Sequence, residues 1–236
     1  MADYGLVRAA KLVRDADLAV TSLCRGGFFT GPDQPSRAKA IQENRVAVDE
    51  AATLGTEVLI LVSGGLPPGS RDLDGARAQV TDALAELAPY AAECGVRLAI
   101  EPLHPMFCSD RCVISTLRQA LDVASRFPAE SVGIVIDAYH VWWDPTLYDQ
   151  LERAGREERI AIFQVCDWVT PLPAGVLNGR GMIGDGCIEL RRLRAAVDNA
   201  GYAGPIEVEI FNDALWSMPA ADVLAASVAR YAEHVI

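Results

Sequence analysis

Four apolar runs in the sequence end at a side chain that carries an oxygen donor. The donors are Glu101 in "VRLAIE", Asp137 in "VGIVID", Gln164 in "IAIFQ" and Glu209 in "IEVEIF". Three carboxylates can share a small volume only if protons or a cation offset their repulsion. Together with an amide oxygen they would form an all-oxygen site of the kind that Mg²⁺ or Mn²⁺ prefers. The alternative for each residue alone is a solvated side chain at the start of a loop.

The elements that would position these donors follow from the apolar periodicity. Short β-rich runs at 18–23, 57–63, 96–103, 132–139, 160–165 and 206–211 alternate with helical patterns at about 35–54, 72–94, 113–126, 146–156, 188–200 and 217–234. Such alternation predicts βαβ units and a parallel sheet. The carboxyl ends of parallel strands would then carry all four donors.

Two α/β arrangements fit this pattern, a doubly wound open sheet and a (β/α)8 barrel. The glycine-containing segments "CRGGFFTG" and "SGGLPPG" match neither the dinucleotide-binding fingerprint nor the P-loop. Barrel enzymes build their sites at the carboxyl ends of the strands, where the polar side chains fall here. The pattern therefore favours a TIM-barrel-like α/β fold. With no linker or repeat in view, we expect one domain spanning residues 1–236.

Composition narrows the functional classes. The chain of 236 residues has a net charge of −11, which argues against nucleic-acid and anionic-membrane partners. No apolar run approaches the roughly 20 residues of a membrane helix, and the N-terminus does not resemble a signal peptide. The six cysteines are dispersed and contain no CxxC pair, so we expect free thiols and a cytoplasmic location.

Five motifs in order, "LAIEPLH", "IDAYH", "FQVCDW", "GRGMIGDG" and "GPIEVEIF", make the sequence similar to the sugar-phosphate isomerase/epimerase family of xylose isomerase-like TIM barrels. Hydroxypyruvate isomerases are the branch that it resembles most. The resemblance covers about residues 4–235. It implies an enzyme with a divalent metal, Mn²⁺ or Mg²⁺ first and Co²⁺ or Zn²⁺ as alternatives.

The resemblance also assigns residues. The implied metal ligands are Glu101, Asp137, Gln164 and Glu209, with glutamine where the epimerases have histidine. Glu101 and Glu209 take the catalytic acid/base roles. The implied substrate-binding residues are His104, His140 and Arg180. Of the two glutamates in "IEVEIF", Glu209 stands where the family has its ligand, and Glu207 would lie deeper on the same face.

The start of the chain differs from the usual family pattern. Relatives begin with a strand, a helix and a second strand, whereas this sequence opens on the helical segment "YGLVRAAKLVRDADL". We therefore expect six parallel strands with helices outside, an N-terminally shortened barrel lacking the first two strands. An open barrel exposes strand edges and apolar surface, so we expect a homodimer in which a second copy covers the open side.

The resulting prediction is a metal-dependent isomerase or epimerase acting through an enediolate on a small sugar, sugar phosphate or hydroxy-keto acid. A metal-dependent hydrolase or lyase of the same superfamily is a poorer fit, because abasic-site endonucleases cluster several histidines around zinc and this chain has three. The remaining alternative is a non-catalytic accessory barrel that binds a sugar-like ligand.

Overall fold

The computed structural model describes residues 4–236, which form two compact units. Of these, unit 1 comprises residues 4–135 and Glu157–Ala161, and unit 2 comprises Ile136–Arg156 and Ile162–Ile236. Residues 1–3 of the expected domain lie outside the described residues. Two strands run from one unit into the other, and the expectation of a single domain stays a prediction.

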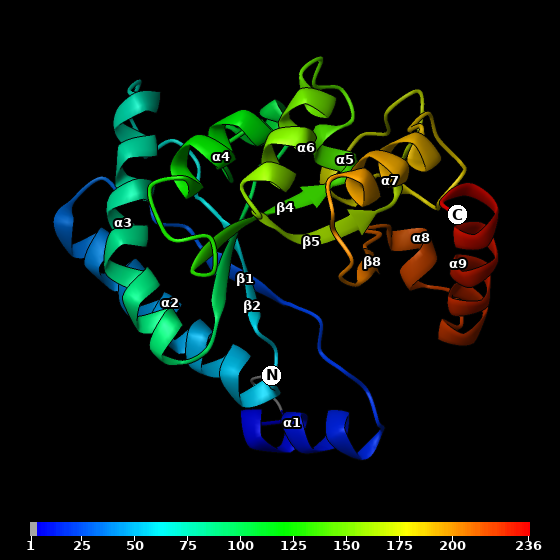
Figure 1. Ribbon diagram of the computed structural model, residues 1–236, viewed down its shortest axis with the longest axis horizontal. Helices are drawn as coiled ribbons and strands as arrows, with labels where there is room; N and C mark the ends of the chain where they lie inside the picture. Colours follow the sequence, from blue (N-terminus) through cyan, green and yellow to red (C-terminus); the bar gives the residue numbers. More distant parts are fainter. Residues whose placement is uncertain (1–3) are drawn as a thin grey trace. The chain divides into compact units, whose positions relative to one another are not determined.

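Unit 1 is a parallel sheet with helices between its strands (Figure 1). β1 pairs with β2, β2 with β3, and β3 with β4, all parallel. α2 packs beside α3 and against α1. The elements in chain order are α1 (Leu6–Asp15), β1 (Leu23–Gly27), α2 (Gln34–Leu54), β2 (Val58–Val62), α3 (Leu73–Glu93), β3 (Arg97–Glu101), η1 (Pro105–Phe107), α4 (Leu117–Ala124) and β4 (Val132–Asp137), whose last two residues belong to unit 2.

Unit 2 contains the last strands and a two-stranded ribbon. β5 pairs in parallel with β8, β6 pairs with β7 antiparallel, and α6 packs against α7 (Figure 1). Its elements are α5 (Ala138–Val141), α6 (Leu147–Arg156), β5 (Ile160–Val165), β6 (Asp167–Trp168), η2 (Val176–Asn178), β7 (Arg180–Gly181), α7 (Leu190–Asn199), β8 (Ile206–Val208), α8 (Asp213–Trp216) and α9 (Ala220–His234).

The main sheet has the order β1-β2-β3-β4-β5-β8, which confirms the predicted six strands of an α/β fold. Among residues 4–236 the structure shows no helix long and apolar enough to cross a membrane. The helix ends also follow the sequence. Asp33 caps α2 by accepting from the Ser36 amide at 2.8 Å, and Gly55 ends that helix with φ of 79°.

The first strand lies later in the chain than its apolar pattern indicates. The run 18–23 predicts a strand, but β1 spans Leu23–Gly27, and Leu18 is exposed. Gly26 and Gly27 allow β1 to approach β2 closely, since a Cβ on Gly27 would stand 1.9 Å from the Val62 carbonyl oxygen. The close approach of the two backbones therefore determines where β1 lies, and the hydropathy pattern gives no sign of it.

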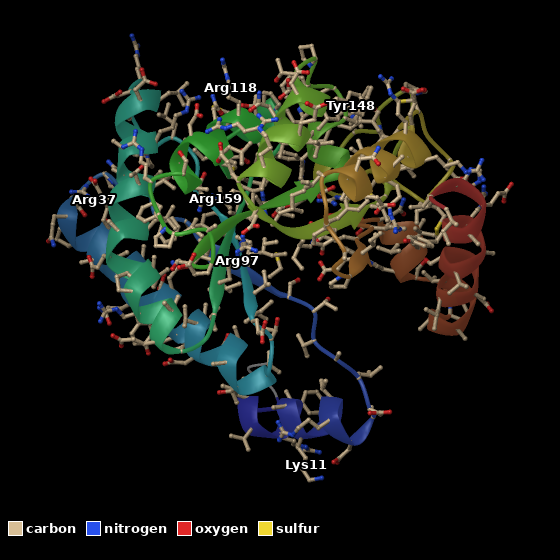
Figure 2. The ribbon with its side chains drawn as sticks, in the orientation of Figure 1. Lys11, Arg37, Arg97, Arg118, Tyr148 and Arg159 are labelled. Atoms are coloured by element: carbon tan, nitrogen blue, oxygen red, sulfur yellow. The ribbon has the colours of Figure 1, made fainter. Side chains whose placement is uncertain are left out.

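Two arginines hold the amino ends of the strands in unit 1, and both are labelled in Figure 2. Arg159 donates to the carbonyl oxygens of Val132 and Phe127, each at 2.8 Å, and Arg97 donates to that of Glu158 at 2.7 Å. Burial lowers the pKa of Arg97. These contacts fix the start of β4, whose opposite end carries Asp137.

The Gly27 contact gives a stability prediction. Gly27→Ala should lower the free energy of unfolding by about 3 kcal/mol or more, because φ is 106° and the new methyl group meets backbone of β2. Gly69→Ala is the matched control. Gly69 also has positive φ, 78°, but has open space around it, so about 1 kcal/mol is expected. Urea unfolding of both variants measures the difference, and equal losses would contradict the close-approach account.

Candidate active site

The guanidinium of Arg180 joins two of the expected metal ligands in unit 2. Its Nη1 lies 2.8 Å from Asp137 Oδ2 and 3.0 Å from Glu209 Oε2. Arg180 is 4% exposed and Asp137 is fully buried, so these are desolvated ion pairs. The positive guanidinium offsets the repulsion between the two carboxylates.

Local structure fixes the positions of both Asp137 and Arg180. Asp137 ends β4 and caps the short helix α5, because its Oδ1 accepts from the Tyr139 amide at 2.8 Å. Arg180 opens β7, where its amide donates to the Phe211 carbonyl at 3.2 Å and its own carbonyl accepts from Asn212 Nδ2 at 2.9 Å. The rings of Tyr139 and Phe211 lie 4.9 and 5.0 Å from the guanidinium carbon.

The loop around Arg180 is anchored by Asp167. Asp167 is 1% exposed. Its Oδ1 accepts from the amides of Trp168 and Ile188 at 2.8 and 3.0 Å, and its Oδ2 accepts from Gly184 at 3.0 Å. All three bonds are to backbone, so Asp167 holds the β6–β7 ribbon against the segment before α7.

His140 is the second basic group at this site. Its Nε2 lies 3.1 Å from Arg180 Nη2. A guanidinium has only donors, so Nε2 accepts and the ring is neutral with its proton on Nδ1. Nε2 is also 3.6 Å from Asp137 Oδ2. A neutral imidazole held in this way presents one defined tautomer to a ligand.

Gln164 offers an oxygen that the protein itself does not use. Its Nε2 donates to Glu207 Oε2 at 2.9 Å, while its Oε1 is buried with no hydrogen-bond partner. A buried acceptor left in this state needs an external partner. The carbonyl oxygen of Gln164 therefore fits a hard cation, as do the carboxylates of Asp137 and Glu209.

Glu209 lies just after β8 rather than within a strand at 206–211 as expected. Its amide donates to the Val165 carbonyl at 3.2 Å, and beyond it the chain pairs with the β7 segment through the Phe211 carbonyl, which ends the strand early. Burial, followed by the negative charge of Asp137, raises the pKa of Glu209 to about 7, and Arg180 opposes that rise.

Two expected site residues belong to unit 1. Glu101 is the last residue of β3, with its carboxylate group buried and its carbonyl oxygen 3.4 Å from Cys112 Sγ. His104 is half-buried, and its Nδ1 accepts from the Met106 amide at 3.2 Å. Burial lowers the pKa of His104. That bond caps η1, which gives His104 a structural contact in its own unit.

The structure thus brings Asp137, His140, Arg180 and Glu209 together, and it adds contacts from residues to which the sequence assigned no role. The additions are Tyr139 and Phe211, which flank Arg180, Glu207, which binds Gln164, and Cys166, whose Sγ lies 3.8 Å from Arg180 Nη1. Burial raises the pKa of Cys166. The period of two places Cys166 with Gln164, and Phe211 with Glu209, which is the signal that could have identified them.

Comparison with known proteins places this geometry in context. A family model described as xylose isomerase-like TIM barrel matches residues 1–234. The inosose isomerase of Bacillus velezensis is 24% identical over 226 residues, which cover 94% of this chain and 78% of that protein.

Two solved structures extend the comparison. The protein SMc04130 from Sinorhizobium meliloti 1021 has a TM-score of 0.95 and 49% identity, covering 99% of this chain and 84% of that one. The IOLI protein with a bound zinc atom has a TM-score of 0.82 and 22% identity, covering 99% and 82%, and shows likeness of fold.

The raised pKa of Glu209 predicts a pH dependence of stability in metal-free protein. The folded state favours protonated Glu209, so this stabilisation is complete below about pH 4.5 and is lost as pH rises through about 7. In Glu209→Gln the side chain stays neutral at every pH. Between pH 4.5 and pH 8, the free energy of unfolding of this variant should fall by about 2 kcal/mol less than that of the unmodified protein. Urea unfolding in the presence of a chelator at both pH values measures this. Identical pH profiles for the two proteins would refute it.

Proposed function

Because the chain belongs to the xylose isomerase-like TIM barrel family, we propose that it is a divalent-metal-dependent isomerase or epimerase of a small sugar-like substrate. The observation that carries this proposal is the cluster of buried Asp137 and Arg180 with half-buried Glu209, together with the unused oxygen of Gln164. Such a donor set suits a hard cation and an oxygen-rich ligand. Sugars, sugar phosphates and hydroxy-keto acids all meet that description.

The proposed ligands are those expected from the sequence: Glu101, Asp137, Gln164 and Glu209. Glu101 is included on its motif position and on its burial at the end of β3. A divalent cation held there would polarise a substrate carbonyl and stabilise negative charge on the adjacent oxygens. Mn²⁺ and Mg²⁺ fit these oxygen donors first, with Co²⁺ or Zn²⁺ as alternatives.

The protein's own residues would move the proton. We assign Glu101 and Glu209 as the acid/base pair, one removing the proton next to the carbonyl and the other returning a proton on the way to product. Burial supports this role for Glu209, because it raises the pKa toward neutrality and makes the carboxylate a stronger base. The planar fork of Arg180 and the neutral ring of His140 would bind substrate oxygens, and His104 is proposed as a further substrate contact.

Loss of a ligand tests the proposed metal site and reaction together. The Asp137→Asn variant should lose most of its bound Mn²⁺ and should catalyse no exchange of substrate protons with solvent, because the substitution removes the charge of a buried ligand. Asp198→Asn is the matched control, since Asp198 is exposed and pairs with Arg194. The measurements are metal content after dialysis against Mn²⁺, and deuterium uptake from D₂O into hydroxypyruvate, ketohexoses and inosose.

The outcomes separate the candidate functions. About one Mn²⁺ per chain with deuterium uptake in at least one substrate supports the isomerase. Metal binding without exchange in any of them would contradict the isomerase and favour the accessory, sugar-binding alternative. No metal at saturating Mn²⁺ would contradict the proposed site. The cytoplasmic location stays a prediction, consistent with six free cysteines.

We further propose that the protein acts as a homodimer in which α1 of one copy covers an apolar face of the other. On unit 2, β8, α8 and α9 line a groove with exposed Trp216, Leu224 and Val228, and α9 has no buried residue. Unit 1 exposes apolar side chains of α1, including Val7 and Leu12.

Charge supports a second copy as the occupant of this groove. Helix α1 carries three basic residues, Arg8, Lys11 and Arg14, against one acid, whereas α8 and α9 together carry three acids and one arginine. A basic amphipathic helix therefore suits the acidic surroundings of the apolar groove.

A charged substitution in the groove tests the dimer. Val228→Glu should shift the molecular mass in light scattering toward the monomer by burying an unpaired charge at the contact. Val46→Glu, at an exposed position of α2, should leave the mass unchanged. A monomer at high concentration, or a dimer indifferent to Val228→Glu, would contradict the proposal.

A further inference from the structure

Arg180 holds one oxygen of each of two proposed metal ligands. Its single Nη1 atom donates to Asp137 Oδ2 and to Glu209 Oε2, at 2.8 and 3.0 Å. The other oxygen of Asp137 accepts from the Tyr139 amide. Both Asp137 oxygens are therefore engaged, and the one facing Glu209 is held by the guanidinium.

The burial of this cluster makes the competition strong. Asp137 is fully buried, Arg180 is 4% exposed and the Glu209 side chain is 22% exposed. In such a desolvated site a fixed guanidinium and a divalent cation at the same carboxylate oxygens repel each other with little screening by water. This repulsion opposes simultaneous contact of both cations with these oxygens.

The backbone of Arg180 is fixed, and its guanidinium is held by side chains and by two aromatic rings. Hydrogen bonds to Phe211 and Asn212 hold the backbone of Arg180 on both sides. The guanidinium itself lies over the flat rings of Tyr139 and Phe211, which favour a cation without requiring one position along the ring.

We propose that Arg180 is an internal cation that holds Asp137 and Glu209 in the metal-free protein and leaves them when a divalent ion binds. The move also frees His140, whose Nε2 accepts from Arg180 Nη2 at 3.1 Å. Both groups then face the substrate, so metal binding prepares the substrate contacts. This inference rests on the proposed function, since it takes the proposed ligands as given.

The experiment is a substrate-free Mn²⁺ titration of the unmodified protein, Arg180→Gln and the control Arg192→Gln, whose guanidinium is exposed beside Glu189. Arg180→Gln should bind Mn²⁺ about tenfold tighter, because no internal cation must be displaced. It should also have a lower Tm without metal and a larger rise in Tm on Mn²⁺ saturation. Arg192→Gln should match the unmodified protein in all three measurements.

Equal or weaker Mn²⁺ binding by Arg180→Gln would overturn the inference, since Arg180 would then stay with the loaded site or act elsewhere. If Arg180→Gln does not fold, guanidinium NMR of the unmodified protein decides. The NMR resonances of the hydrogen-bonded Arg180 guanidinium must change when the protein is saturated with Mg²⁺. Unchanged resonances would overturn the inference.

These readouts are independent of turnover. Absence of deuterium uptake in every substrate would contradict the isomerase while tighter Mn²⁺ binding by Arg180→Gln still supports the internal-cation role. Conversely, active enzyme whose Mn²⁺ affinity is indifferent to Arg180→Gln keeps the proposed function and refutes this inference.

Discussion

Two carboxylates that are largely removed from water need a positive partner, and this constraint organises unit 2. Asp137 and Glu209 meet at one guanidinium, whose positive charge offsets the repulsion between them. The cap of α5, the β6–β7 ribbon and the backbone bonds of Asp167 all serve to hold these three side chains in place. Because the charge balance needs a cation, the same geometry can serve a metal.

This arrangement links the stability of the protein to its chemistry. A partly buried carboxylate with a raised pKa, such as Glu209, is a stronger base than an exposed one, and its burial also destabilises its charged form. Arg180 limits that destabilisation while no metal is bound. Under the proposed internal-cation role, substrate oxygens reach this site only after its internal pairs open, which favours substrate contact after metal binding.

Much of this could be predicted from the sequence, because the pattern that buries a strand also marks where it ends. β2 to β5 lie within the predicted runs, and the motifs around Asp137, Arg180 and Glu209 identified residues that do meet. What hydropathy could not show is backbone geometry. The glycines of β1 place that strand at Leu23–Gly27, later than the apolar run predicts. The hydrogen bond between Arg180 and Phe211 accompanies an end of β8 before Glu209.

Side-chain pairing was equally beyond the sequence pattern. The bond from Gln164 to Glu207, which leaves Oε1 of Gln164 unused, depends on the register of β5 against β8. Glu101 and His104 lie in unit 1, where Glu101 is buried and His104 caps η1. That Glu101 and His104 join the cluster of Asp137 and Glu209 stays a prediction from the order of the motifs.

Anomalous scattering from crystals grown with Mn²⁺ tests the central claim most directly. The account predicts one strong peak about 2.0–2.4 Å from carboxylate oxygens of Asp137 and Glu209 and from Oε1 of Gln164, with the Arg180 guanidinium withdrawn from both carboxylates. A peak at other residues, or none at saturating Mn²⁺ with the Arg180 pairs intact, would contradict it.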